Sequence, residues 1–458
     1  MPSAFRQGGR EGQERPGRRT VAPADVHEVL ERHLLLEAFP LVLDISKSHG
    51  SFLIDARDGT EYLDLYSFFA SSPLGMNPPG LADDPEFLHE LATVACNKPA
   101  NAEIATTCLA EFVETFSRVL GDPALPNLFF IEGGALAVEN ALKVAFDWKS
   151  RRNERAGRSR DLAGKVMHLR YAFHGRSGYT MSLTNTDVSK IDRYPKFDWP
   201  RIPSTAVTFP LSEHLAETEL LEREALDAAE QAFERDRHDI SCFIFEPIQA
   251  EGGDRHLRAE FLQAMQVLCH RYDALFIADE VQTGAGATGS PWCYQELGLE
   301  PDVVAFGKKI QLGGIMAGRR VEEEAENVFR VPSRINSTWG GNLVDMVRST
   351  RLLELVEETD AMGNARREGA HLVDRLEELS RRFPTLNNPR GRGVLAAVDC
   401  TDTATRDAVL RSLREDEHVL ALACGEVSLR FRPNLAVTRD VIDRGCDALG
   451  RVLERLGA

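Results

Sequence analysis

The sequence lacks any pair of cysteines spaced as in a zinc site or a redox motif. Its eight cysteines are scattered over 458 residues without a CxxC, and several lie inside apolar runs. Disulfide frameworks and structural zinc sites depend on closely or regularly spaced cysteines. We therefore expect reduced, mostly buried thiols in a cytoplasmic protein, and no metal site.

Long apolar runs and an excess of positive charge are also missing. No apolar stretch approaches the roughly 20 residues that a membrane-spanning helix needs. The balance of 54 Lys and Arg against 71 Asp and Glu gives a formal net charge of -17. An acidic protein is a poor partner for nucleic acid or for an anionic membrane, so we expect a small-molecule ligand.

The first residues lack the apolar segment of a secretory signal. They are rich in Gly and Arg instead, and we expect residues 1–24 to form a disordered tail. A transit peptide is the alternative, and Glu11 and Glu14 count against it.

Five short apolar runs alternate with helical patterns in the middle of the chain. They are LFFI at 128–131, VMHL at 166–169, CFIF at 242–245, ALFIA at 274–278 and VVAF at 303–306. Runs that are apolar at every position are typical of strands buried on both faces of a parallel sheet. Patterns such as ALAVENALKVAFDW supply the crossover helices, so the sequence predicts an α/β fold with a mostly parallel central sheet.

The pattern changes after about residue 341. Helical patterns there precede two strand-like runs, GVLAAVDC and VSLRFRP, and a final helix, an order typical of an α+β lobe. We expect the small lobe to combine an N-terminal segment, 25–75, with a C-terminal domain, 342–458. The large domain then spans 76–341.

A distinctive residue follows most of the five runs. In chain order these are Gly133 and Gly134, then a loop with Phe173 and Arg176, then Glu246, Asp279 and Lys308. Ligands in open α/β sheets bind at the carboxyl ends of the strands, so we expect these residues to converge on one crevice.

Asp279 and a lysine after the next strand form the pair that pyridoxal phosphate chemistry requires. The carboxylate keeps the pyridine nitrogen protonated, and the lysine holds the aldehyde as a Schiff base. Both Lys308 and Lys309 lie close to a buried strand end, and the residues alone do not decide between them. The alternatives are a helix cap or an ion pair for Asp279, and a solvated surface charge for either lysine.

The turn after the first run is a candidate phosphate site. Gly133 and Gly134 let the backbone approach closely, and the helix that begins near Ala135 offers unpaired N–H groups and about half a positive charge. Glycines are also common at such turns for steric reasons alone. Phe173 is a candidate to stack on a ring, with a place in the core as the alternative.

Six motifs together resemble the class III aminotransferases of fold type I. The motifs are EGGALAVENALK, FHGR, EPIQAEGG, DEVQTG, PDVVAFGKK and NSTWGGN. The similarity runs from about residue 25 to the C-terminus, and VPSRINSTWGGNLVDMVR is most like the lysine 6-aminotransferases of that family. The resemblance implies transfer of the ε-amine of L-lysine to 2-oxoglutarate with pyridoxal 5'-phosphate, giving L-glutamate and 2-aminoadipate 6-semialdehyde, which cyclises.

The resemblance also assigns the cofactor residues. Lys308 directly follows the glycine and matches the Schiff-base lysine, which leaves Lys309 pointing elsewhere. The other matches are Asp279 for the pyridine nitrogen, Gln282 near the ring hydroxyl, Gly134 and Ala135 in the phosphate loop, and Phe173 and Val281 on the two faces of the ring.

Two residues imply a shared active site. Thr338, with Asn336 close by, matches a threonine that reaches the phosphate of the neighbouring subunit. The resemblance therefore implies a homodimer.

The substrate residues follow from the same resemblance. Arg176 matches the arginine that grips the carboxylate far from the reacting amine, and Arg430 matches the one for the second substrate's α-carboxylate. Arg432 lies on the same strand face, so the choice of Arg430 rests on the family match. Glu251 matches a glutamate that covers Arg430 and swings aside, with a structural ion pair as the alternative. Ala250 replaces an expected glycine, which would restrict that swing.

Several alternatives stay open. Ornithine, 4-aminobutyrate or another ω-amine is a competing substrate, because one methylene changes binding by only about 1–3 kcal/mol. The Glu251 and Arg430 pair argues against a racemase or aminomutase on the same scaffold. A non-catalytic relative is opposed by the complete set of cofactor matches.

GAGATG at 284–289 spells the fingerprint of an NAD-dependent dehydrogenase, but residues 279–283 separate it from the strand and no apolar helix follows.

Overall fold

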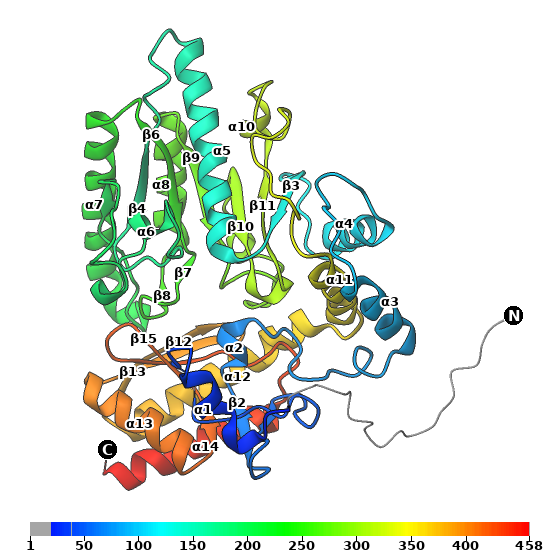
Figure 1. Ribbon diagram of the computed structural model, residues 1–458. Coiled ribbons are helices and arrows are strands. Elements are labelled where there is room, and N and C mark those ends of the chain that lie inside the picture. Colours follow the sequence, from blue (N-terminus) through cyan, green and yellow to red (C-terminus); the bar gives the residue numbers. More distant parts are fainter. Residues whose placement is uncertain (1–19, 38, 458) are drawn as a thin grey trace, which may run out of the picture.

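A seven-stranded sheet forms the centre of the larger part of the molecule (Figure 1). This computed structural model describes residues 20–37 and 39–457. The strand order is β3 (Asn127–Ile131), β11 (Gly313–Ala317), β10 (Val303–Phe306), β9 (Leu275–Asp279), β6 (Ile240–Phe245), β4 (Lys165–Leu169) and β5 (Arg201–Ile202). Only β11 runs antiparallel to its neighbours, so the expected mostly parallel sheet is confirmed.

The five predicted apolar runs all form strands of this sheet. β6 and β9 are buried at every position. Alternate side chains of one strand enter two different cores: Ile244 faces the cluster that includes α5, whereas Phe243 and Phe245 face the other. The helices of this part are α3 (Pro85–Ala95), α4 (Thr107–Val119), α5 (Gly134–Arg155), α6 (Thr180–Leu183), α7 (Leu211–Arg235), α8 (Ala259–Arg271), α9 (Cys293–Glu296) and α10 (Arg319–Glu322).

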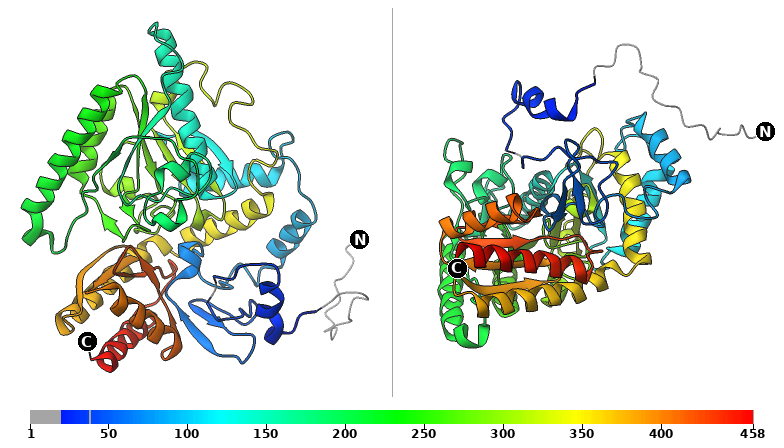
Figure 2. Two further views of the ribbon diagram at one scale, coloured as in Figure 1. Left: turned by 60° about the vertical axis from the view of Figure 1, so that its left-hand side comes forward. Right: turned by 90° about the horizontal axis from the view of Figure 1, so that it is seen from below.

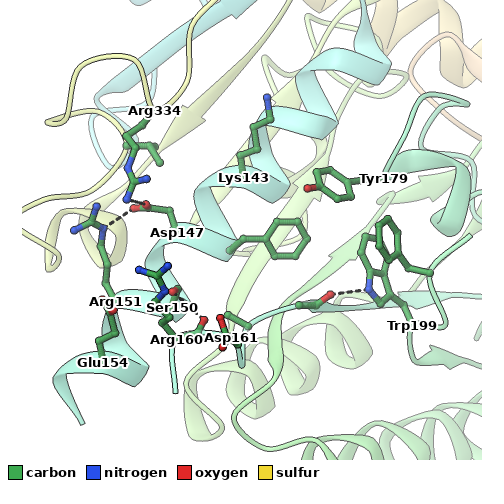
Figure 3. Close-up of a pocket in the computed structure, with 15 residues that line it drawn as sticks. Lys143, Asp147, Ser150, Arg151, Glu154, Arg160, Asp161, Tyr179, Trp199 and Arg334 are labelled. Atoms are coloured by element: carbon green, nitrogen blue, oxygen red, sulfur yellow. Dashed lines mark hydrogen bonds and ion pairs between the residues drawn. The ribbon is translucent and has the colours of Figure 1, made fainter. Parts of the chain in front are cut away.

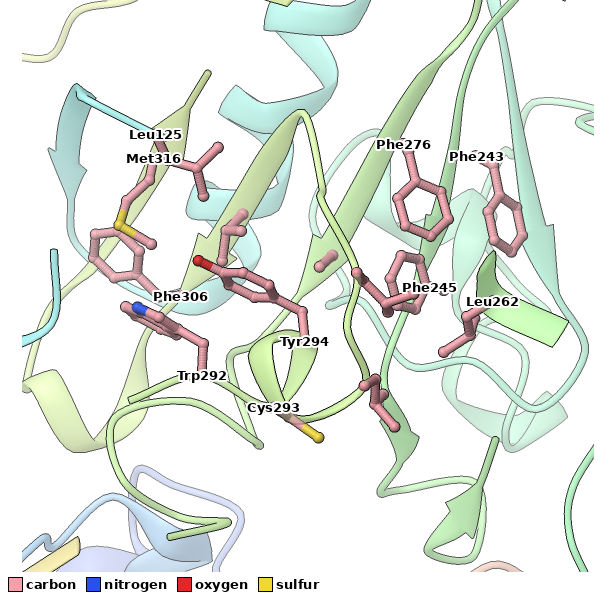
Figure 4. Packing of buried hydrophobic residues seen from close by; sticks show 14 of the residues in the cluster. Leu125, Phe243, Phe245, Leu262, Phe276, Trp292, Cys293, Tyr294, Phe306 and Met316 are labelled. Carbon is pink, nitrogen blue, oxygen red and sulfur yellow. The ribbon is translucent and has the colours of Figure 1, made fainter. Parts of the chain in front are cut away.

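An aromatic cluster fixes the end of β10. The centroid of the Phe306 ring lies 5.1 Å from that of Phe116. It lies 5.8 Å from that of Trp292 (Figure 4). The indole N–H of Trp292 donates a hydrogen bond to the carbonyl of Leu120 at 2.6 Å. Since aromatic packing and a satisfied indole both restrict movement, the residues just after Phe306 leave the sheet from a rigid base.

The smaller lobe contains a four-stranded sheet of order β12 (Leu386–Arg392), β13 (Leu395–Cys400), β16 (Ser428–Phe431) and β15 (Leu422–Cys424). Its helices are α12 (Ala361–Arg382), α13 (Thr403–Glu415) and α14 (Arg439–Leu456), and α11 (Leu343–Glu358) leads into it from the large part. A register shift between Asn387 and Arg390 interrupts the pairing of β12 with β13.

Residues from the two ends of the chain meet in this lobe. β1 (Phe52–Ile54) and β2 (Glu61–Asp64) form a sheet with β14 (Val419–Leu420), in which β2 and β14 run parallel. Figure 2 shows the blue N-terminal segment beside the orange and red C-terminal segment. The expected α+β lobe built from both ends is therefore confirmed.

The remaining short elements lie in loops. They are η1 (Pro23–Asp25), α1 (Val26–Glu31), α2 (Ser67–Ala70), η2 (Val188–Lys190), β7 (Ile248–Gln249), β8 (Arg255–His256) and η3 (Lys308–Ile310). Most of the tail expected over residues 1–24, up to residue 19, lies outside the described residues. No helix within 20–37 or 39–457 is long and apolar enough to cross a membrane. All eight cysteines are free and six of them are buried, which agrees with the expectation of buried thiols.

Candidate active site

The carboxyl ends of β10, β9, β6 and β4 bring the predicted residues to one edge of the sheet. A Cβ atom placed on Gly307 would lie 3.4 Å from both the Cα of Gly134 and a methyl of Val281. Three segments distant in sequence therefore meet around one point. The backbone N–H of Phe173 donates to the carboxylate of Glu246 at 2.9 Å, which ties the loop after β4 to the end of β6.

Asp279 is held in a fixed orientation. It is 4% exposed, and its Oδ2 lies 2.7 Å from Nδ1 of the fully buried His174. Its Oδ1 accepts a hydrogen bond from the backbone N–H of Val281 at 3.1 Å. The Nε2 of His174 has no partner among the described residues. The prediction for Asp279 did not include His174, although the FHGR motif contains it.

Glu246 provides a second buried carboxyl beside Asp279. Burial raises its pKa well above the usual range, and the negative charge of Asp279 adds to this effect. A neutral Glu246 avoids the repulsion between two carboxylates in a site with little water.

The two adjacent lysines occupy different environments. Lys308 has a backbone φ of +52°, in the left-handed region, and is partly buried. Burial, together with the positive charge of Arg430, lowers its pKa to about 8. Lys309 is 4% exposed, and its amine donates to the carbonyl of Ala70 at 3.0 Å. Burial also holds the pKa of Lys309 well below its usual value. Neither lysine is a solvated surface charge.

The start of α5 forms a tight cradle. Gly133 has a φ of +92° and precedes the first residue of the helix, Gly134. A Cβ on Gly134 would lie 2.8 Å from a methyl of Val281. On the other side, a Cβ on Gly175 would lie 2.6 Å from the Cβ of Ala135, so the loop after β4 closes over the helix terminus. Free N–H groups at such a terminus suit an anionic group.

Gln282 carries an unused buried acceptor. Its side-chain Oε1 is shielded from solvent and has no hydrogen-bond partner among the described residues. Buried polar atoms are usually paired, so an orphan beside Asp279 indicates that a ligand completes the site.

Arg430 lies on β16 and Arg432 directly follows that strand. Both side chains are buried, but they have different partners. Arg432 pairs with Asp254, and both side chains are almost fully buried. Arg430 is 2% exposed and donates from Nη2 to Glu251 at 2.9 Å. The Nε and Nη1 groups of Arg430 have no partner in the described part of the chain. Arg432 has one such group, its Nε, so Arg430 keeps the larger unused hydrogen-bonding capacity of the two.

Glu251 bonds to two cations at once. Its Oε2 faces Arg430, and its Oε1 accepts a hydrogen bond from the amine of Lys190 at 2.8 Å. Burial alone would raise the pKa of Glu251, but the two cations outweigh it and hold the pKa below its usual value. Lys190, 61 positions away from Glu251 in the chain, has no distinctive spacing or motif and was not predicted. The neighbouring Ala250 is buried, and its N–H is bound to Glu246.

Three predicted residues make no side-chain hydrogen bond or ion pair with this cluster in the described part of the chain. Arg176, Asn336 and Thr338 are exposed. The side chain of Asn336 accepts a hydrogen bond from the adjacent Ser337 N–H at 2.8 Å. Asn336 and Thr338 lie in the segment between α10 and α11.

A cavity of about 650 Å³ lies elsewhere, beside α5 (Figure 3). Asp147 pairs there with both Arg151 and Arg334 at 2.8 Å, and the indole of Trp199 donates to the carbonyl of Gly164. None of the predicted site residues lines it.

The GAGATG segment is a loop rather than a nucleotide-binding turn. The next helix, α9, begins only at Cys293 and has four residues. Its glycines serve close packing: a Cβ on Gly284 would lie 2.5 Å from the ring of Trp292, and one on Gly286 would lie 2.9 Å from Met362.

Comparison with known proteins establishes the class. The family description Aminotransferase class-III matches residues 37–453. The chain belongs to the class-III aminotransferases, as the sequence motifs indicated.

The most similar relatives are more specific. An L-lysine-epsilon aminotransferase of Amycolatopsis lactamdurans is 56% identical over 434 residues, which cover 94% of this chain and 96% of that protein. The solved lysine aminotransferase from M. tuberculosis in the internal aldimine form has a TM-score of 0.93 and 54% identity, covering 95% of this chain and all of that one. A 4-aminobutyrate aminotransferase of Schizosaccharomyces pombe is 31% identical over 443 residues, covering 92% and 90%.

Proposed function

We propose that this protein transfers the ε-amino group of L-lysine to 2-oxoglutarate, using pyridoxal 5'-phosphate. The observation that carries the proposal is the buried Arg430, which is covered by Glu251 yet keeps two donor groups unused. An enzyme that alternates between a long amine and a dicarboxylate needs an arginine that is covered for one substrate and free for the other. The high identity to lysine ε-aminotransferases favours L-lysine as the amine.

The residues at the strand ends fit the cofactor. Lys308 would hold it covalently through Nζ, and the α5 terminus at Gly134 and Ala135 would bind its phosphate. Asp279, oriented by His174, would keep the pyridine nitrogen protonated. Bound there, pyridoxal phosphate supplies an electron-withdrawing ring that stabilises negative charge on the substrate carbon.

The remaining cofactor contacts follow from the same arrangement. We assign Phe173 and Val281 to the two faces of the ring and the orphan Oε1 of Gln282 to the ring hydroxyl, which would donate to it. The tight approach of Val281 to Gly134 supports this assignment, because it places the valine beside the phosphate cradle.

Lys308 also acts on protons. Once its amine is free, it takes a proton from the ε-carbon of lysine and later returns one on the cofactor side. A pKa of about 8 leaves a useful fraction of this amine neutral near neutral pH.

The arginines divide the substrate carboxylates between them. Arg176 binds the α-carboxylate of L-lysine while Glu251 keeps Arg430 occupied. 2-Oxoglutarate then binds across Arg176 and Arg430 and leaves as L-glutamate. The lysine product, 2-aminoadipate 6-semialdehyde, cyclises because its amine and aldehyde are in one molecule.

The active unit in this proposal is a homodimer. Asn336 and Thr338 are exposed, which suits residues that reach the phosphate of a neighbouring subunit. We also keep the domain limits of 25–75, 76–341 and 342–458, and a cytoplasmic location, as parts of the proposal.

The test follows the cofactor spectrum of the purified protein as L-lysine is added without a keto acid, with the product identified by NMR. We expect loss of the absorbance band of the bound cofactor and a cyclic imine with an intact α-carbon. Ornithine and 4-aminobutyrate serve as controls. A response to either of these and none to L-lysine would contradict the proposed substrate.

A further inference from the structure

Glu251 is shared between two cations from different parts of the fold. Lys190 closes the short helix η2 in the large part, and Arg430 lies on β16 of the small lobe. The Glu251 carboxylate uses one oxygen for each, at 2.8 Å and 2.9 Å. Two positive charges therefore share one negative charge, so the three side chains together carry one unbalanced positive charge.

Hydrogen bonds hold the backbone next to Glu251 and next to Lys190. The carbonyl of Glu251 accepts a hydrogen bond from Gly425 N–H at 3.0 Å, which ties its loop to the turn before β16. On the other side, the Asp187 side chain caps η2 through the N–H of Ser189 at 2.9 Å. Lys190 thus presents its amine from a defined position.

We propose that Lys190 is a positioning residue that holds Glu251 while Arg430 binds a substrate carboxylate. This inference rests on the proposed function. When Glu251 leaves Arg430, its charge stays paired with Lys190, and the incoming carboxylate pairs with Arg430. The charges then form two complete ion pairs, whereas without Lys190 the released carboxylate would be left unpaired in a partly buried site.

Arg430 is the group that makes the exchange necessary. Its side chain is 2% exposed, against 28% for Glu251 and 29% for Lys190. The buried arginine needs an anion at all times, while the two outer groups border water. Lys190 also lies 5.8 Å from the ring centroid of Phe173, so its amine stands beside the predicted cofactor pocket.

The first test compares the two half-reactions in K190M. Glu251 then has only Arg430 as a partner, so we expect the KM for 2-oxoglutarate to rise about tenfold, as loss of a partly buried ion pair of about 1.4 kcal/mol implies. The half-reaction with the amine donor should change less than about twofold. K190R should restore the wild-type KM, and K143M, which removes an exposed lysine on α5, is the matched control.

The second test asks whether Lys190 acts through Glu251. In the E251Q background, K190M should have no further effect on the KM for 2-oxoglutarate. Calorimetry of the holoenzyme with glutarate, a dicarboxylate without a keto group, should give the same pattern in Kd. An undiminished effect of K190M in E251Q, or an equal loss with both substrates, would overturn the proposal.

The two proposals fail in distinguishable ways. The reaction of L-glutamate with 2-oxoglutarate uses only the second half-reaction, so Lys190 is testable whatever the amine donor is. Failure with L-lysine would alter the proposed substrate alone, and a normal KM for 2-oxoglutarate in K190M would reject the role of Lys190 alone.

Discussion

Neighbouring residues of the same type differ here because their surroundings differ. Lys308 and Lys309 leave β10 together, but Lys308 faces the charges of Arg430, Glu251 and Asp279, whereas Lys309 is buried against the carbonyl of Ala70. Burial disfavours the protonated form of both amines. Only the first faces the predicted cofactor residues.

The pKa of Lys308 predicts how the apo-protein takes up pyridoxal phosphate. The neutral amine is the reactive form, and its fraction rises as the pH passes the pKa. We expect the uptake rate, followed by absorbance, to rise with a midpoint near pH 8 and to level off above it. K308A should show no covalent uptake and K309M the same midpoint. A midpoint near 10.5 would show that Lys308 is not desolvated.

The residues that the sequence did not predict are those that contact and orient other site residues. Asp279 and the lysine pair 308–309 are predictable because each follows a recognisable apolar run, and the family resemblance selects Lys308 from the pair. His174 and Lys190 contact them or their partners from loops whose paths depend on the whole chain, and a single histidine or lysine has no distinctive spacing. Such contacts carry little signal in one sequence.

At the scale of elements, β16 and the residue just after it carry two arginines with different ion-pair partners. The pair of Arg432 and Asp254 is shielded from water, and the second oxygen of Asp254 has no partner among the described residues. Removing one member of a buried pair leaves an uncompensated charge.

We therefore expect R432M to lower the free energy of unfolding by about 3–5 kcal/mol, measured by urea denaturation. R432M/D254N should recover part of this loss, because the buried charge is then gone. R430M should cost less, since Glu251 borders water. An equal decrease in the free energy of unfolding in R430M and R432M would contradict a mainly structural role for Arg432 alone.

The start of α5 gives a second prediction at this scale. G134A would place a methyl 2.8 Å from Val281, and relief of this contact would displace the helix terminus or the valine. We expect cofactor binding to weaken by about 1–3 kcal/mol, measured as Kd by fluorescence. G164A is the control, because its nearest contact is at 3.6 Å. Unchanged affinity in G134A would argue against this cradle as the phosphate site.

The elements divide into those that were predictable and those that were not. The runs 128–131, 166–169, 242–245, 274–278 and 303–306 became strands because their apolar character is local. β11 begins with Gly313, which packs closely against the backbone of Gly133, and Gly314, which packs closely against the ring of Phe306. β12 contains Pro389. Glycine and proline disfavour strands, so tertiary pairing determines both.

At the scale of the molecule, Asn336 and Thr338 are exposed on their own chain. If they complete the neighbour's site, two inactive variants should complement each other. We expect mixed K308A and N336A/T338A dimers to regain about a quarter of the wild-type activity, because half of the dimers are mixed and each has one intact site. The unmixed variants are the controls, and no recovery after verified subunit exchange would contradict shared sites.

The small sheet has a consequence for the order of assembly during synthesis. β2 pairs in parallel with β14, and the N–H of Leu63 bonds to the carbonyl of His418 at 2.8 Å. Chains emerge from the ribosome at about 5–20 residues per second, so β14 is synthesised on the order of tens of seconds after β2. All seven strands of the large sheet have been synthesised by then, because the last of them, β11, ends at Ala317. The small lobe therefore closes last, and the ion pair of Arg430 with Glu251 cannot form until translation is nearly finished.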